Sequence, residues 1–267
     1  MPLAVCATPI GNLDDVTLRV LAELRDADVV LCEDTRHTRV LLERHGIRAR
    51  LLSYHEHNER KRTAELLPRL LAGERMALVS DAGLPGISDP GTRLVAAALD
   101  GGVAVTVLPG SSAVDTALVA SGLASERYQF LGFLPRTKGA LAALWEELRM
   151  WPFTAVAFES PQRLPGTLRS LADAEPERLV AVCRELTKVH EEVVRGTADE
   201  VAGRFASPPR GEITLVIGPG PGVDADLERA SAAVAELVVA GVARRRAAEV
   251  VARLTGTSKN ELYRRTL

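Results

Sequence analysis

The sequence lacks the short motifs that identify the most common classes of enzyme. Its 267 residues contain no G-x-x-x-x-G-K-[ST] loop, no H-E-x-x-H, no paired C-x-x-C and no G-x-S-x-G. Such motifs supply a lysine-bearing phosphate cradle, a zinc site, a metal or redox pair, or a serine nucleophile on a tight turn. Their absence argues against ATP hydrolysis by a Walker loop, zinc chemistry and ordinary esterase chemistry.

Cysteine is scarce, and long hydrophobic runs are missing. Cys6, Cys32 and Cys183 are odd in number, lack metal-ligand spacing and fall in strand-like runs, which favours buried free thiols in a reducing compartment. The N-terminus has no basic segment followed by an apolar one, and the most apolar later stretch, residues 232–243, is short and broken by Glu236. The sequence therefore predicts a cytoplasmic protein with no membrane partner.

No metal site is predicted. His55 and His57 alternate along a segment that is expected to be extended, so their side chains are expected to face opposite ways.

Positive charge is concentrated at the C-terminus. The formal net charge is −2, yet residues 241–267 hold seven Lys or Arg against two Glu, a net +5 that leaves −7 for the rest. The basic end is a candidate contact for a polyanion. The alternative is a helical pair that packs on the body, or on a second copy of the chain, with its arginines in water.

The first part of the chain alternates between strand and helix patterns. The strand patterns fall at residues 3–8, 28–34, 50–55, 75–81 and 103–110, and the helix patterns at 14–27, 38–45, 59–72 and 92–100. Asp14 or Asp15 is placed to cap the first helix. The alternation predicts a largely parallel sheet in a first α/β domain, residues 1–118, with ligands at the carboxyl ends of its strands.

A second α/β domain is predicted at residues 122–218. Its strand patterns fall at residues 128–135, 154–160, 178–186, 191–196 and 212–218, and its helix patterns at 138–150, 161–172 and 197–206. Residues 218–226 have the composition of a linker, and residues 226–267 predict a basic extension of two or three short helices. Within it, a turn at Gly256 and a cap at Ser258 suggest the second half of a helix-turn-helix.

The loop "SDAGLPGISDPG", residues 80–91, is unusual for a strand-to-helix connection. Its three glycines permit positive φ and a close approach of backbone amides to a ligand, and its prolines stiffen it. Asp81 can accept hydrogen bonds from ribose hydroxyls or an amino group. The alternative is a plain turn with a helix cap. The nearby "PGSSA" favours a ligand, because a helix start with Ser111 and Ser112 suits a carboxylate or phosphate.

Nine segments together resemble one known family. They are "ATPIGNLDDVTLRVLAEL", "CEDTRHTRVLL", "SYHEHNE", "LVSDAGLPGISDPG", "LPGSSAVDTAL", "FLGFLPR", "FESPQR", "CRELTKVHEE" and "GEITLVIG". In this order, from about residue 3 to 218, they resemble the ribosomal RNA small subunit methyltransferase I family, cytidine 2′-O-methyltransferases of the tetrapyrrole-methylase fold. The ending "TGTSKNELYRR" also resembles that family's C-terminal extension.

The resemblance implies that S-adenosylmethionine binds in a cleft between two α/β domains, usually in a homodimer. It implies methyl transfer to the ribose 2′-hydroxyl of a cytidine in the decoding region of 16S ribosomal RNA, with the free RNA or the 30S subunit as partner. The cofactor contacts that it implies are Pro9, Asp81, Ala82, Gly83, Ile87, Ser112, Ala113, Phe158, Ile213 and Thr214.

The same loops supply candidates for catalysis. A 2′-hydroxyl is a weak nucleophile, so a nearby base or hydrogen-bond acceptor would help. The candidate acceptors are Asp34, His57, Glu59, Glu159 and Glu191, and the candidate cations are Arg36 and Lys188. Asp34 is preferred because it directly follows a strand, although it is equally suited to cap the next helix.

One departure from the family pattern limits these candidates. The family often has Tyr and His where this chain has Phe158 and Gln162, which argues against a mechanism that requires a histidine there.

Two other functions also remain open, a small-molecule methyltransferase of the tetrapyrrole type and a non-catalytic RNA-binding module. A small-molecule methyltransferase does not need the basic C-terminal extension, and an RNA-binding module does not explain the glycine- and proline-rich loop at residues 80–91.

Overall fold

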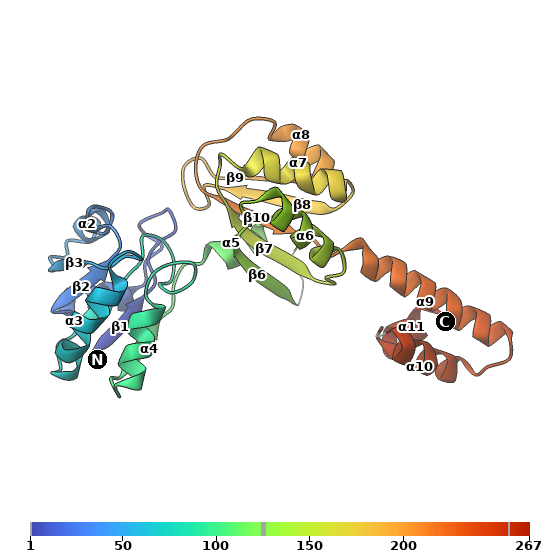
Figure 1. The fold of residues 1–267 in the computed structure, drawn as a ribbon, viewed down its shortest axis with the longest axis horizontal. Coiled ribbons are helices and arrows are strands. Elements are labelled where there is room, and N and C mark those ends of the chain that lie inside the picture. Colours follow the sequence, from blue (N-terminus) through green and yellow to red (C-terminus); the bar gives the residue numbers. More distant parts are fainter. Residues whose placement is uncertain (1, 124–126, 256) are drawn as a thin grey trace.

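The computed structural model describes residues 2–123, 127–255 and 257–267 and contains two sheets followed by a group of helices (Figure 1). The first sheet carries helices on both faces. The second sheet lies in the middle of the molecule, and α9 (Pro221–Val239) leads from it to the C-terminal helices. This arrangement confirms the predicted α/β class with a helical extension.

The first sheet is fully parallel, with the strand order β3-β2-β4-β1-β5. Its strands are β1 (Leu3–Cys6), β2 (Val29–Cys32), β3 (Leu51–Ser53), β4 (Met76–Leu78) and β5 (Val105–Leu108). One face packs against α1 (Leu18–Asp26) and α2 (Thr35–Arg44), and the other against α3 (Glu59–Leu71) and α4 (Thr92–Asp100). The polar loops that follow all five strands therefore lie at one edge.

Local hydrogen bonds correct two predicted helix starts. α1 begins at Leu18 because the Thr17 hydroxyl accepts a hydrogen bond from the Val20 amide, so neither Asp14 nor Asp15 caps it. Asp14 instead accepts two hydrogen bonds from Arg44. α2 begins at Thr35 and not at residue 38, because Asp34 caps it.

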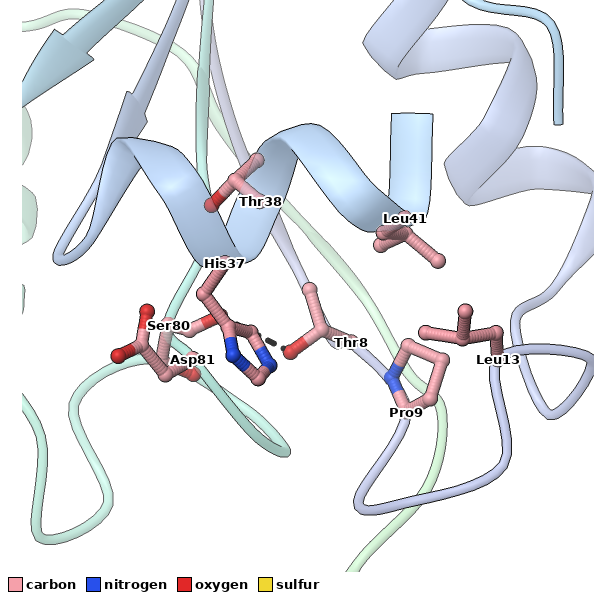
Figure 2. A pocket seen from close by; sticks show the side chains of 8 residues that line it. All are labelled: Thr8, Pro9, Leu13, His37, Thr38, Leu41, Ser80 and Asp81. Carbon is pink, nitrogen blue, oxygen red and sulfur yellow. Dashed lines mark hydrogen bonds between the residues drawn. The ribbon is translucent and has the colours of Figure 1, made fainter. Parts of the chain in front are cut away.

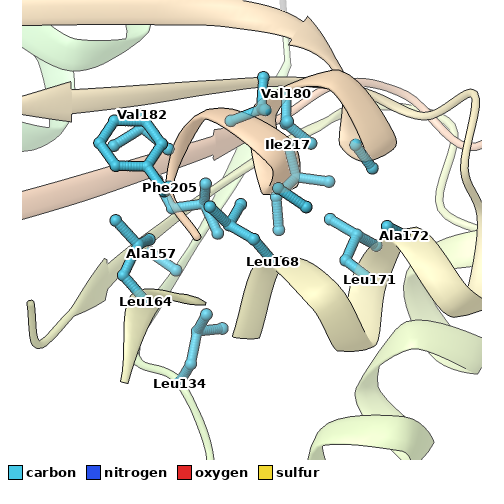
Figure 3. Close-up of a cluster of buried hydrophobic side chains, with 14 of the residues drawn as sticks. Leu134, Ala157, Leu164, Leu168, Leu171, Ala172, Val180, Val182, Phe205 and Ile217 are labelled. Carbon is cyan, nitrogen blue, oxygen red and sulfur yellow. The ribbon is translucent and has the colours of Figure 1, made fainter. Parts of the chain in front are cut away.

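The second sheet is mixed, with the order β6-β7-β10-β8-β9. Its strands are β6 (Tyr128–Phe133), β7 (Thr154–Glu159), β8 (Leu179–Arg184), β9 (Glu192–Thr197) and β10 (Ile213–Ile217). Only β6 and β7 pair in parallel, and the other neighbours are antiparallel. The helices α6 (Lys138–Arg149), α7 (Leu164–Ala174) and α8 (Ala198–Arg204) pack on its outer face and bury the core drawn in Figure 3.

The opposite face of this sheet, here called the inner face, packs against α5 (Ala113–Ser121). Val114, Ala117 and Leu118 of this helix share a buried cluster with Val156 and Val216 of the sheet. Ile10, from the loop after β1, joins the same cluster. The predicted first domain, residues 1–118, includes most of α5, whereas the buried side chains of α5 pack on the second sheet. The inner face thereby contacts loops of the first sheet.

The cysteines lie in strands, as predicted. Cys6, Cys32 and Cys183 are buried and free, and burial raises the pKa of the Cys6 and Cys183 thiols to about 12. They act as small apolar side chains.

The C-terminal helices form a small unit with its own core. α9 packs with α10 (Arg244–Thr255) and α11 (Lys259–Arg265) around Leu227, Ala230, Val234, Ala247, Ala248, Val251 and Leu262. The predicted linker at 218–226 is partly wrong, because α9 begins at Pro221, where a proline's missing N–H is not needed. The predicted turn at Gly256 lies outside the described residues, and Ser258 precedes α11 without a side-chain capping bond. No helix in the described ranges is long and apolar enough to cross a membrane.

Candidate active site

A small pocket lies at the carboxyl edge of the first sheet, where β1, β2 and β4 end. Figure 2 shows its eight lining residues, Thr8, Pro9, Leu13, His37, Thr38, Leu41, Ser80 and Asp81. The loops after β1 and β4 are joined by two backbone hydrogen bonds between Thr8 and Gly83, of 2.8 and 3.1 Å. The Thr8 hydroxyl also donates to the Ser80 carbonyl at 3.0 Å. The predicted cofactor residues Pro9, Asp81 and Gly83 therefore lie together.

The loop at residues 80–91 has the backbone that its composition predicts. Gly83, Gly86 and Gly91 have φ values of 79, 88 and 139°, a region that strains other residues. Gly91 also occupies the cap position of α4, so the capping alternative explains this one glycine. It does not explain Asp81, which is one of the lining residues of the pocket and whose carboxylate accepts a hydrogen bond from the Asp34 amide at 3.2 Å.

Negative charge gathers around this pocket. Burial, reinforced by the charges of Glu33 and Asp81, raises the pKa of Asp89 to about 6, against an opposing hydrogen bond with Ser80. Burial also raises the pKa of Glu33, and the charges of Asp81 and Glu56 add to it. Carboxylates that repel one another favour a positively charged ligand.

The substitution Asp89→Asn is expected to raise the free energy of unfolding by about 1 kcal/mol at pH 7 and to leave it unchanged near pH 4. The pKa of Asp89 in the folded protein lies above the ordinary value of 3.8, so the wild type loses stability as the pH rises from that value to about 6. Urea unfolding at the two pH values measures the difference, with Asp100→Asn, at the exposed end of α4, as control. An equal gain at both pH values contradicts the prediction.

Asp34 serves as a helix cap in the structure. Its carboxylate accepts from the Arg36 amide at 2.8 Å and from the Arg36 guanidinium at 3.1 and 2.8 Å. These bonds, the side-chain ones above all, hold the pKa of Asp34 well below its usual range. A carboxylate with so low a pKa is a weak base. The geometry thus favours the capping alternative for Asp34, and it leaves Arg36 largely exposed.

The loop after β1 meets the loop after β8 at a close contact. The Asn12 amide donates to the Thr187 hydroxyl at 2.9 Å. A Cβ placed on Gly11 would lie 2.5 Å from Lys188 Cγ and 2.8 Å from the Leu186 carbonyl oxygen, so a larger residue does not fit there. Lys188, one of the predicted site residues, therefore borders the first domain's loops.

Ion pairs hold Lys188 in place. Its ammonium donates to Glu185 and Glu212, each at 2.8 Å. Burial lowers the pKa of Lys188, but these two bonds outweigh burial and raise it overall. Lys188 is therefore a fixed positive charge.

The second sheet divides its predicted site residues between its two faces. Phe158 and Thr214 are paired across β7 and β10 and lie on the inner face. The Ile213 side chain belongs to the outer core, so a contact of Ile213 with a ligand at the inner face would be made by its backbone. Glu159 is only 2% exposed, and it accepts from Thr167 at 2.6 Å and pairs with Arg163 at 3.3 Å. This carboxylate is enclosed on the side away from the inner face.

Three predicted contacts from separate segments do meet. Ala82, Ala113 and Phe158 pack against the same buried cluster between α5 and the second sheet. Ile87 projects from the loop at residues 80–91 with its side chain half exposed. The two serines of "PGSSA" are already bonded, since Ser112 caps α5 and the Ser111 hydroxyl donates to the Asp15 carbonyl at 2.9 Å.

The remaining acidic and histidine candidates have structural partners. Glu59 begins α3 and pairs with Arg93 at 3.2 Å, and Glu191 accepts from the Thr187 amide at 2.6 Å. His55 and His57 lie in a turn with ring centroids 5.9 Å apart, so the expectation that they face opposite ways is wrong. Even so, no group of three or more potential metal ligands occurs among the residues with described positions.

His37 was not among the site residues predicted from the sequence. It lies one helical turn after Asp34 and lines the pocket together with Thr8 and Asp81 (Figure 2). Its spacing from Asp34 could have indicated this position, because residues three apart on a helix share a face.

Comparisons with known proteins show which family this sequence matches. The family model for Tetrapyrrole (Corrin/Porphyrin) Methylases matches residues 2–202. The ribosomal RNA small subunit methyltransferase I of Mesorhizobium japonicum is 45% identical over 271 residues, which cover 99% of this chain and 91% of that protein.

Solved structures share the fold. The methyltransferase CobJ matches with a TM-score of 0.62 at 20% identity, over 81% of this chain and 93% of that one. Uroporphyrin-III C-methyltransferase from Thermus thermophilus, complexed with S-adenyl homocysteine, matches with a TM-score of 0.56 at 20% identity, over 81% and 96%. Because the family model matches residues 2–202 and the Mesorhizobium japonicum protein is 45% identical over nearly the whole chain, the chain belongs to the tetrapyrrole methylase family and, within it, to the ribosomal RNA small subunit methyltransferase I family.

Proposed function

We propose that this protein transfers the methyl group of S-adenosylmethionine to the ribose 2′-hydroxyl of a cytidine in the decoding region of 16S ribosomal RNA. The observation that carries the proposal is the similarity, at 45% identity and over 91% of its length, to a ribosomal RNA methyltransferase. A ribosomal substrate supports a cytoplasmic location for the reaction.

The residues at the first sheet's edge fit this cofactor. S-adenosylmethionine carries a sulfonium and an ammonium group, Asp81 lines the pocket, and the charges of Glu33 and Asp89 lie close enough to interact with that of Asp81. Gly83 lets the backbone approach a ligand closely. The residues that would hold the cofactor are Pro9, Asp81, Ala82, Gly83, Ile87, Ser112, Ala113, Phe158, Ile213 and Thr214.

The chemistry asks mainly for alignment. When bound, S-adenosylmethionine supplies a methyl group that its sulfonium already activates. The protein then has to hold the ribose oxygen in line and exclude water. Asp34 keeps Arg36 at the edge of the site, where this cation can meet an RNA phosphate. Lys188, paired with Glu185 and Glu212, fixes the second loop against Gly11. Glu159, being enclosed, positions its neighbours and takes no proton from the substrate.

The test is transfer of labelled methyl from S-adenosylmethionine to 30S subunits that lack the modification, followed by digestion and mass spectrometry of the nucleosides. A 2′-O-methylcytidine product supports the proposal. Unlabelled RNA with retained cofactor binding overturns it and favours a tetrapyrrole-type small-molecule substrate. Free 16S RNA as a parallel substrate decides between RNA and the assembled subunit, and sedimentation tests the proposed homodimer.

The C-terminal helical unit is proposed to add an RNA contact. Residues 241–267 carry a net charge of +5, and Arg245 and Arg253 of α10 are exposed. In Figure 1 the unit projects away from both sheets at the end of α9. A basic surface held away from the body suits the phosphate backbone of a large RNA.

Replacing Arg245 and Arg253 together by alanine is expected to weaken binding to 30S subunits and to reduce the slope of log affinity against log salt by about two. For each phosphate contact that is lost, roughly one counterion fewer is released from the RNA on binding. The control removes two exposed arginines elsewhere, Arg25 and Arg60. Binding is measured by filter retention from low to moderate salt. Equal losses for both variants would show that total charge, and not this unit, determines binding.

A further inference from the structure

Phe133 is an exposed aromatic side chain at the carboxyl end of β6. Its side chain is 62% exposed, although Phe130 and Phe158 beside it are half-buried. Its ring centroid lies 5.5 Å from that of Phe158 at an interplanar angle of 62°, and Phe130 lies 5.0 Å from Phe158 on the same side. An aromatic ring packed on one side and open on the other is suited to stacking.

An irregularity in β6 places this ring on the inner face. Side chains alternate along a regular strand, so Phe133 would share the outer face with Leu131. Instead the pairing of β6 with β7 shifts between Phe130 and Phe133, and Phe133 aligns with Phe158. Gly132 takes a φ of 66°, which allows the bulge. The backbone is thus built to turn Phe133 toward the proposed cofactor site.

The bulge also lies beside the loop at residues 80–91. A Cβ placed on Gly132 would lie 3.6 Å from the Ser88 hydroxyl. Ser88 is next to Ile87, and Phe158 shares its cluster with Ala82 and Ala113. Phe133 is therefore at the border of the proposed cofactor site, on its exposed side.

An arginine that pairs with a buried carboxylate fixes the chain that follows Phe133. The Arg163 guanidinium donates to the carbonyl oxygen of Leu134 at 3.1 Å and to that of Pro135, and it pairs with the enclosed Glu159. The next cation along the chain, Arg136, is exposed. Phe133 and Arg136 thus flank residues 134–135, whose backbone carbonyl groups are hydrogen-bonded to Arg163.

We propose that Phe133 is the stacking platform for the nucleobase of the acceptor nucleotide, with Arg136 against a neighbouring phosphate. Bases splayed out of RNA stack on aromatic side chains, and a cation beside the ring neutralises the backbone. This assignment rests on the proposed function. It gives Glu159 and Arg163 the role of positioning residues for the platform.

The experiment compares Phe133→Leu with Phe133→Tyr in methyl transfer to unmodified 30S subunits. Leucine keeps apolar bulk without an aromatic face, so kcat/KM is expected to fall about 5- to 100-fold, whereas tyrosine is expected to stay within about threefold of wild type. Calorimetry with S-adenosylmethionine is expected to give an unchanged Kd for both variants. Met150→Ala, which removes a 64% exposed apolar side chain after α6, is the control.

Each other outcome overturns the assignment. Equal activity of the leucine and tyrosine variants would mean that the aromatic face does not matter. A rise in the Kd for S-adenosylmethionine as large as the loss of kcat/KM would make Phe133 a cofactor contact. A failure of the proposed function is distinguishable, because the wild type would then label no RNA at all.

Discussion

The substitution Asp81→Ala is expected to weaken S-adenosylmethionine binding about 10- to 100-fold, because hydrogen bonds to charged groups contribute about 1.5–3 kcal/mol. Asp81 lies three residues after the end of β4 and lines the pocket at the loops after β1 and β4. The Asp34 amide holds its carboxylate in place at 3.2 Å. The cofactor's ammonium or ribose hydroxyls would lose this acceptor. Titration calorimetry with the purified protein measures the effect directly.

Two controls separate this loss from a general loss of structure. Asp100→Ala removes an exposed carboxylate at the end of α4 and is expected to leave the affinity unchanged. Asp81→Asn keeps an acceptor oxygen but removes the charge, so its affinity is expected to fall between those of the wild type and the alanine variant. An Asp81→Ala protein that binds S-adenosylmethionine like the wild type would remove Asp81 from the cofactor site.

The first sheet and its ligand edge were predictable because their signals are local. Alternating strand and helix patterns imply a parallel sheet, and a parallel sheet brings the loops after its strands to one edge. Positive φ values at Gly83, Gly86 and Gly91 could be predicted from the residue type alone. The polar loops after β1, β2 and β4, which are far apart in the sequence, therefore line one pocket.

Other features depend on contacts that no local pattern encodes. Asp34 is an exception, because the Arg36 bonds that make it a cap are local, yet its sequence context is the same whether it serves as a base or as a cap. The face on which Phe133 lies depends on a register shift against β7. The packing of α5 on the second sheet likewise depends on residues far along the chain. Tertiary contacts, not propensity, settle these points.

The start of the C-terminal extension was misjudged for a similar reason. Prolines and glycines at residues 218–222 indicate a linker by composition, yet the segment is fixed by long-range bonds. The Gly218 amide donates to the Leu179 carbonyl at 2.8 Å, and the Gly220 amide to that of Trp151 at 3.0 Å. A Cβ on Gly220 would meet the Arg149 carbonyl, so glycine is needed for this close approach.

Arg178 ties that segment to the second sheet through a buried network. Its side chain is 1% exposed and donates to the Gly218 carbonyl at 2.7 Å, to the Leu148 carbonyl at 3.1 Å and to Glu175 at 3.0 Å. Burial lowers the pKa of its guanidinium, against the opposing effect of Glu175. Removing the cation would leave a buried carboxylate and two carbonyl groups without their partner.

Replacing Arg178 by methionine is therefore expected to lower the free energy of unfolding by about 3–5 kcal/mol. Both tryptophans of the chain, Trp145 and Trp151, lie in or against the core of the second sheet, so their fluorescence during urea unfolding reports on this region. Arg169→Met is the matched control, because Arg169 pairs with Asp199 at 3.9 Å on an exposed surface; this substitution is expected to change the stability by less than about 0.5 kcal/mol. Adding Glu175→Gln to the Arg178 variant is expected to recover part of the loss, since it removes the stranded charge. Similar losses for the Arg178 and Arg169 variants would contradict the role assigned to the network.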